Sequence, residues 1–278
     1  MGDLAAVVVA VGDIPCRRHE AGAALKLQVL NMMSLIAAAA ISASSCSAPD
    51  EVVTTAVVAG VAQSAHSASE SGGELRYCEY FMVDGRGNVR VLYYDPQGQK
   101  IAEKHLSLPQ DTSSHSIAGE ARPEVIQEDF RHGEIREVIR EGDNWRIRYR
   151  RNAQARWQDS VLPDANVDVV DAGFDPFVRE HWGPLTSGET VEFDFVSPVH
   201  GQSVRLRARA VACNSSVTAS DHVCLEIDLA QPWLRWLAGD LFVTYSSRDR
   251  RLLYFRGVVN LHDERGKVQK LSIRYFYR

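Results

Sequence analysis

The sequence predicts a β-rich α+β fold, an antiparallel meander that forms a curved sheet or half-barrel with one or two packed helices. Three observations predict it. Short β-prone runs alternate with tight-turn residues across residues 75–278, apolar and charged side chains alternate within several runs, and two apolar helical patterns interrupt them. Residues 75–278 are enough for a single domain with a full core.

A secretory signal precedes this domain. Lys26 leads an apolar run that reaches Ile41, and small residues follow up to Cys46, which is the layout of a bacterial signal peptide. Residues 1–24 carry as many as three acidic residues and make a poor n-region, so we expect translation to start at Leu25. Residues 1–46 are then an upstream extension plus the signal. The apolar run is shorter than the roughly 20 residues of a membrane span.

Two cleavage sites compete. The residues Ala43-Ser44-Ser45-Cys46 resemble the lipobox of bacterial lipoproteins, in which the cysteine is acylated and becomes the mature N-terminus; Ala43 departs from the usual leucine. A plain signal-peptidase cut nearby, or one after Ser67, is the alternative. We favour lipidation of Cys46 and expect residues 47–74, which are rich in small residues, to be a flexible tether.

The charge balance of the predicted domain is close to neutral. Of 31 basic and 36 acidic residues, 28 and 29 lie in residues 75–278, so the domain is nearly neutral. This balance gives no electrostatic argument for nucleic acid or acidic substrates.

Two of the five cysteines are placed to form a disulfide. Cys213 and Cys224 flank a polar loop between two strand-like runs, and we expect them to bridge in an oxidising periplasm, with two free thiols as the alternative. Cys78 lies in a strand pattern and reads as a small buried hydrophobe.

The strands follow one another in hairpins. Trp145–Arg150 alternates apolar residues with arginines, and the clearest pair joins Thr190–Val196 to Ser203–Val211. Across that turn Glu192 is expected to face Arg207 and Asp194 to face Arg205, which favours one register. The other predicted strands are Leu75–Val83, Val89–Tyr94, Ile101–Leu108, Ile135–Arg140, Leu241–Tyr245, Leu252–Phe255 and Val268–Tyr277.

Two helices are predicted. Asp171–Leu185 places aromatic residues along one face and would pack on the sheet. Gln231–Gly239 is short, bulky and apolar. Core packing is the ordinary use of such residues, but they also form the candidate wall of a ligand site, whose members are Trp182, Trp233, Trp236 and Leu237.

No catalytic, metal or cofactor motif occurs. The chain lacks a nucleophile elbow, a phosphate loop, a zinc-protease motif and a dinucleotide fingerprint, so we predict no catalytic residue, no metal and no cofactor. The rival hypothesis is a periplasmic hydrolase whose site is assembled from dispersed loop residues such as Asp175, Glu180 and His181.

Two segments carry a resemblance. Ala172–Trp182 reads AGFDPFVREHW, and LFVTY at 241–245 is followed by RRLLYFRG at 250–257. Together they resemble an uncharacterised family of secreted proteobacterial proteins. More loosely, a meander of strands that wraps a helix on an exported chain is similar to the LolA/LolB-like half-barrel envelope proteins, which implies an apolar concavity that holds acyl chains.

We therefore expect a non-enzymatic cell-envelope module in the periplasm. It binds a lipid or acyl ligand or an envelope protein, does not bind nucleic acid, and reaches a membrane only through a lipid anchor.

Overall fold

A computed structural model describes residues 46–64, 73–107, 120–213, 221–231 and 241–278. The strands are β1 (Val58–Ser64), β2 (Leu75–Val83), β3 (Val89–Tyr94), β4 (Lys100–Ser107), β5 (Glu124–Asp129), β6 (Glu134–Glu141), β7 (Asn144–Arg150), β8 (Gln158–Pro163), β9 (Val191–Ser197), β10 (Gln202–Val211), β11 (His222–Leu229), β12 (Leu241–Ser246), β13 (Leu252–Val258) and β14 (Lys270–Tyr277). The helices are α2 (Asp50–Thr55), α3 (Phe174–Glu180) and α4 (Trp182–Thr186), with 3-10 turns η2 (Asp164–Asn166) and η3 (Asp171–Gly173).

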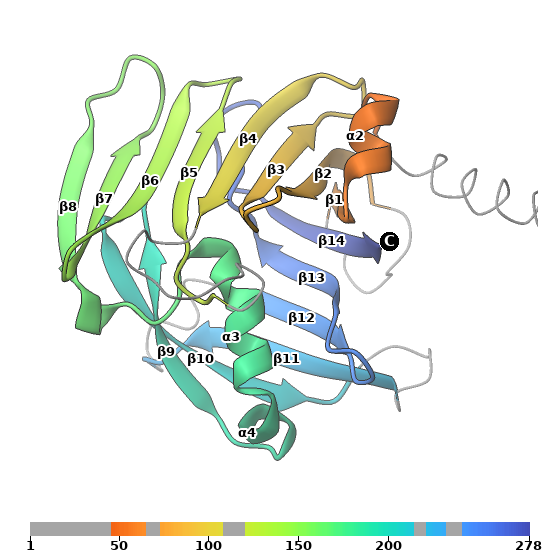
Figure 1. The fold of residues 1–278 in the computed structure, drawn as a ribbon, viewed down its shortest axis with the longest axis vertical. Helices are drawn as coiled ribbons and strands as arrows, with labels where there is room; N and C mark the ends of the chain where they lie inside the picture. The colour runs from red at the N-terminus through yellow and green to blue at the C-terminus, as the bar shows by residue number, and fades with distance from the viewer. Residues whose placement is uncertain (1–45, 65–72, 108–119, 214–220, 232–240) are drawn as a thin grey trace, which may run out of the picture. The chain divides into compact units, whose positions relative to one another are not determined.

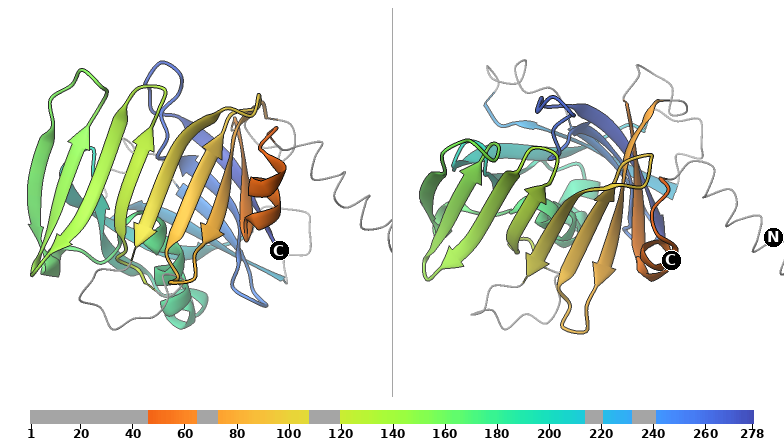
Figure 2. Two further views of the ribbon diagram at one scale, coloured as in Figure 1. Left: turned by 45° about the horizontal axis from the view of Figure 1, so that its top comes forward. Right: turned by 90° about the horizontal axis from the view of Figure 1, so that it is seen from above.

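All fourteen strands belong to one antiparallel sheet. Its order is β8-β7-β6-β5-β4-β3-β2-β1-β14-β13-β12-β11-β10-β9, so the chain runs along the sheet from β1 to β8 and returns through β9 to β14 on the other side of β1. The sheet curves, as Figure 1 and Figure 2 show. The prediction of a curved antiparallel meander with packed helices is confirmed.

Strand β1 lies at the centre of the sheet. It pairs with β14 over its whole length and with β2 from Val58 to Gln63. Residues 58–64 are therefore not part of a flexible tether, and the compact unit runs from Ser44 to Arg278 rather than from residue 75. The small side chains that suggested a linker have a packing reason: Gly60 lies between Glu79 and Tyr275, and Ala62 lies between Tyr77 and Ile273.

The concave face of the sheet is filled with side chains. One apolar cluster joins Tyr77 and Tyr93 to Ile273, a second places Phe177 and Leu185 of the helices against Tyr245 and its neighbours on β9–β12, and a third lies around Trp145. Helices α3 and α4 thus cover the concave side of β9–β12.

The predicted helix over Asp171–Leu185 is present in three pieces. η3 leads into α3, and His181 interrupts the helix between α3 and α4. Pro184 is accommodated within α4, because it lies in the first turn, where a backbone N–H has no intrahelical partner to lose.

The convex face carries a smaller cluster. Residues Cys46, Val52, Val53 and Ala56 pack over β1–β3 against Tyr80 and its neighbours. Strands β1, β5 and β8 were not predicted from the sequence. The predicted β9–β10 register is correct: Glu192 pairs with Arg207 and Asp194 with Arg205. The ion pairs differ in part, because Arg207 binds Asp228 of β11.

Trp145 tests the packing of the third cluster. Its side chain is 0% exposed, and its indole Nε1 donates to Asp164 Oδ1 at 2.8 Å. Trp145→Phe removes this bond and leaves a small void, so we expect it to lower the free energy of unfolding by about 1–3 kcal/mol. Denaturant titration measures the change.

Trp157→Phe is the matched control. Trp157 is 37% exposed, so its replacement should change stability by no more than about 0.5 kcal/mol. Equal losses in the two variants would contradict the burial of Trp145.

Candidate functional site

A row of polar side chains crosses the apolar concave face. Register places its strand members on the same face as Tyr77 and Val91, because Val91 pairs with Lys104, Lys104 with Gln127, and Ala102 with Asp129. We call this set the concave polar row. Its members are Glu79, Lys104, Gln127, Asp129, Glu134, Arg136, Asp171, Asn260, His262 and Tyr275.

Glu79 lies at the centre of β2 and is 5% exposed. A Cβ atom at Gly60 would lie 2.7 Å from Glu79 Cγ, so only glycine leaves room for this carboxyl. The Tyr275 hydroxyl hydrogen-bonds with Glu79. Burial raises the pKa of Glu79 to about 7, against the opposing effects of Lys104 and Tyr275, while Asp171 adds to the rise. Glu79 therefore exchanges its proton near neutral pH.

Lys104 of β4 is bound to Asp171 on the opposite side of the concave face. Lys104 Nζ lies 2.5 Å from Asp171 Oδ1, and the lysine is 3% exposed. Burial alone would raise the pKa of Asp171, but Lys104, the backbone N–H of Ala172 and Asn260 outweigh it, so its pKa lies below the usual range. Asp171 has a φ of 45°, a left-handed conformation that costs a non-glycine residue free energy.

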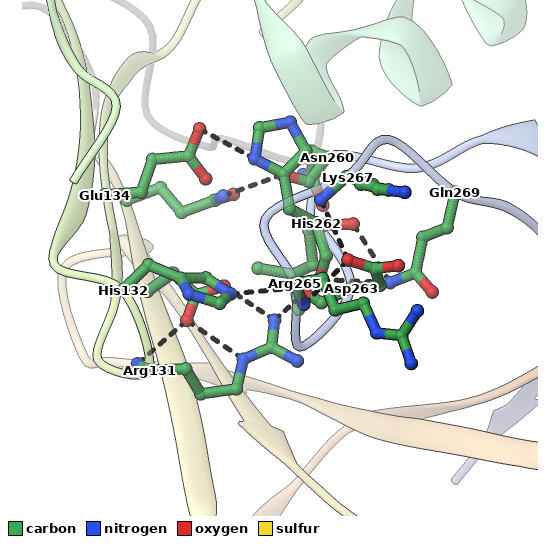
Figure 3. A network of polar contacts seen from close by, with 12 residues as sticks. Arg131, His132, Glu134, Asn260, His262, Asp263, Arg265, Lys267 and Gln269 are labelled. Carbon is green, nitrogen blue, oxygen red and sulfur yellow. Dashed lines mark hydrogen bonds and ion pairs between the residues drawn. The ribbon is translucent and has the colours of Figure 1, made fainter.

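The β13–β14 connection joins the row to the turn between β5 and β6 (Figure 3). Arg131 binds the carboxylate of Asp129 and donates from Nη2 to the carbonyl of His262 at 2.8 Å. His132 Nε2 lies 2.8 Å from the carbonyl oxygen of Asp263. Gln127 donates to the carbonyl of Asn260. These bonds link segments about 130 residues apart in the chain.

A histidine and a glutamate meet in the same region. His262 Nδ1 lies 3.3 Å from Glu134 Oε1, and Arg136 Nη2 lies 2.9 Å from the same oxygen. Burial opposes ionisation of Glu134, but His262 and Arg136 outweigh it and lower the pKa of Glu134. This carboxylate is therefore held as an anion by two cationic or donor groups, which suits a structural ion pair better than a general base.

The concave polar row is a network of side chains bonded to one another. Most of its members are buried. Two cavities, of about 180 and 120 Å³, lie away from the row and border β7–β8 and β6–β7. Among the described residues, no cluster of histidine, cysteine and carboxylates could hold a metal ion.

Trp182 is the one predicted ligand-wall residue that the structure describes. It begins α4 and is partly buried, with its ring edge-on to Tyr245 at 5.9 Å between centroids. The guanidinium of Arg250 lies 5.5 Å from its ring centroid. The predicted wall residues Trp233, Trp236 and Leu237 lie outside the described residues, as does most of the predicted helix 231–239.

The residues of the hydrolase hypothesis have other partners. Asp175 is paired with Arg179 one helical turn later, and burial raises the pKa of Asp175. His181 Nδ1 lies 2.9 Å from the carbonyl of Phe177, and the ring stacks on Phe177 with 4.1 Å between centroids. Glu180 is exposed. Among the described residues, no hydrogen bond or ion pair joins these three side chains to one another as an acid–base group.

Two disulfides are present among the described residues. Cys213 is bonded to Cys224, with 5.4 Å between their Cα atoms. Cys46 is bonded to Cys78, with 5.8 Å between their Cα atoms. Cys78 is therefore not an unpaired hydrophobe. The Cys46 sulfur that lipidation would use is engaged in this disulfide, so the two modifications exclude each other.

The concave polar row was not predicted from the sequence. Glu79 carries the clearest signal. It lies two residues from both Tyr77 and Phe81, on the same face of the strand, and so places a charge on the apolar side. Lys104 shows the same pattern between Ala102 and Leu106. Asp171 and His262 lie in connections, where no periodicity points to burial.

Comparison with known proteins adds no family. No protein-family model matches the chain, and no curated protein is significantly similar to it. The resemblance to secreted proteobacterial proteins and to LolA/LolB-like half-barrels stays a prediction. Within the described residues, no helix is long and apolar enough to cross a membrane.

The raised pKa of Glu79 makes stability depend on pH. Folded Glu79 holds its proton up to about pH 7, whereas the unfolded side chain releases it near 4.5. The free energy of unfolding should therefore fall as the pH rises from about 4.5 to about 7, by about 3 kcal/mol, and this contribution should be flat above that.

Glu79→Gln should flatten this decline, as measured by denaturant titration at several pH values. Glu128→Gln is the control, because Glu128 is exposed on the neighbouring convex side of β5. A decline of equal size in Glu79→Gln would show that Glu79 is not its source.

The disulfides predict a cysteine map. Protein recovered from an oxidising compartment, digested without reduction, should give two linked peptide pairs, Cys46 with Cys78 and Cys213 with Cys224. The measurement is mass spectrometry after alkylation. An acylated Cys46 together with an alkylated Cys78 would replace the first disulfide by the lipoprotein route.

Proposed function

We propose that this protein is an exported, non-enzymatic envelope module that binds a hydrophobic ligand, a lipid or acyl chain, on the concave face beneath α3 and α4. The observation that carries the proposal is the covering of the second apolar cluster. Its sheet residues, among them Phe193, Leu225 and Val243, are fully buried, and the cover over them includes helices of only seven and five residues.

Such short helices are held by packing and not by their own stability. Isolated helices need about 12–15 residues to be even marginally stable in water. The helical state of α3 and α4 thus depends on Phe177, Val178 and Leu185, which rest on the sheet. An apolar ligand that replaces these contacts costs little helix stability, so displacement of the helices is the proposed route to the concave face.

Trp182 is the proposed point of entry. It lies at the junction of α3 and α4 and packs only partly into the cluster. Arg250 next to it comes from the β12–β13 turn, which also carries Arg248 and Arg251 against a single acid, Asp249. A tryptophan beside a positively charged turn is a suitable site for an amphiphile with a negative head group.

Export is supported by the disulfides. Structural disulfides persist in oxidising compartments and are rare in the cytosol. The two bonded pairs use four of the five cysteines, and the fifth, Cys16, lies upstream of the proposed signal. The proposed location is the periplasm. A lipid anchor at Cys46 would require that this cysteine be left out of its disulfide.

Binding of a dansyl-labelled fatty acid tests the proposal. The full mature chain should bind it saturably and show energy transfer from tryptophan to the probe. Trp182→Ala should weaken binding by about tenfold or more, because a large aromatic contact at the entry is lost.

Trp157→Ala is the matched control, because Trp157 stacks on Arg148 and is not a member of the concave clusters. Its affinity should equal that of the wild type. Thermal melting of each variant separates lost binding from lost folding. If Trp182→Ala does not fold, Trp182→Phe, which keeps an aromatic ring, takes its place. Absence of saturable binding by the wild type to any amphiphile would refute the ligand and leave an envelope protein as the partner to seek.

A further inference from the structure

One lysine lies within electrostatic reach of two carboxylates on the concave face. Lys104 is bonded to Asp171, and its charge also acts on Glu79. With Glu79 protonated, the charges of Lys104 and Asp171 balance. With Glu79 ionised, the same buried region holds one cation and two anions, which is costly where little water can screen them.

The two carboxylates differ in their freedom to move. Glu79 is fixed in the middle of the sheet, where β2 is paired on both sides and Gly60 provides its space. The Asp171 side chain is 21% exposed, and its residue lies in the connection that leads directly into α3. An excess negative charge is therefore relieved most easily by movement of Asp171.

The backbone of Asp171 favours the same movement. Its φ of 45° is a strained conformation that persists only while surrounding contacts hold it. The contacts from its carboxylate are Lys104 Nζ, the N–H of Ala172 and a longer one to Asn260 Nδ2 at 3.4 Å. Loss of Lys104 would remove the shortest of them.

We propose that Glu79 and Asp171 compete for Lys104, so that proton loss from Glu79 loosens the start of α3 and opens the cover formed by α3 and α4. This proposal rests on the proposed function, because it makes access to that site dependent on pH. The cover is held at acidic pH and released above neutral pH.

The other groups that face Glu79 do not compete for this role. Tyr77 on the same strand, Tyr93 of β3 and Tyr275 of β14 have pKa values that burial raises, so these phenols stay neutral across the range concerned. Strand β1 presents only Gly60. Asn260 is uncharged, and Arg131 acts on Tyr77 and is bonded to Asp129. Lys104 is thus the cation that both carboxylates share.

Hydrogen exchange measures the cover without any ligand. In the full mature chain, protection of residues 174–186 should fall by about tenfold between pH 6 and pH 8 after correction for intrinsic exchange. A tenfold change corresponds to a difference of about one unit between the pKa of Glu79 with the cover closed and with the cover open. Protection of β10 and β11 should stay constant. Glu79→Gln should keep residues 174–186 protected at both pH values.

Two further variants complete the design. Asp171→Asn should leave residues 174–186 weakly protected at both pH values, because the ion pair is absent throughout. Glu128→Gln should behave like the wild type. A fall in protection that persists in Glu79→Gln, or no fall in the wild type, would overturn the proposal. Since no ligand is present, this result is independent of whether fatty acid binds.

Discussion

The whole sheet depends on the close approach of β2 and β14 across β1. Strand β1 joins the two directions in which the chain travels along the sheet, and it does so with small inward residues. Gly60 and Ala62 leave space that Glu79, Tyr77 and Tyr275 fill from the neighbouring strands. A larger side chain at Gly60 would collide with Glu79, which cannot move aside because it is buried. The composition that looks like a linker is thus the composition that the centre of the sheet requires.

The convex face secures the same strand from the other side. Cys46 and α2 precede β1 and pack over it, and the disulfide to Cys78 binds this segment to β2. Cleavage after Ser67 would remove β1 from its own sheet, whereas cleavage just before Cys46 would leave strand, helix and disulfide together. Of the predicted cleavage sites, the upstream one is thus the one compatible with β1 remaining in its sheet.

Local pattern was sufficient for most of the fold and insufficient for the candidate site. The β9–β10 hairpin was predictable because opposite charges at Asp194 and Arg205 specify a register that neighbours can enforce. The α3–α4 segment was predictable from its aromatic stripe, but the break at His181 was not. β1 was not predicted because its residues are small to make room for large side chains of the neighbouring strands, which lie elsewhere in the sequence. The ion pair of Lys104 with Asp171 joins residues 67 positions apart, and no local period encodes such a contact.

The concave polar row contributes little stability for the number of buried charges that it contains. Buried ion pairs often contribute less stability than apolar residues of the same volume, because desolvation offsets their attraction. What they provide is a specific arrangement, since each charge accepts few partners. Arg131 and His262 fix the β13–β14 connection against β5, which needs only bonds that stay formed. Glu79 is different, because among the described residues the cation that acts on it, Lys104, is already bonded to Asp171. An apolar residue at this position would stabilise the sheet at every pH, so the presence of a carboxyl group there is best explained by a need for the contact between β4 and η3, which leads into α3, to be reversible.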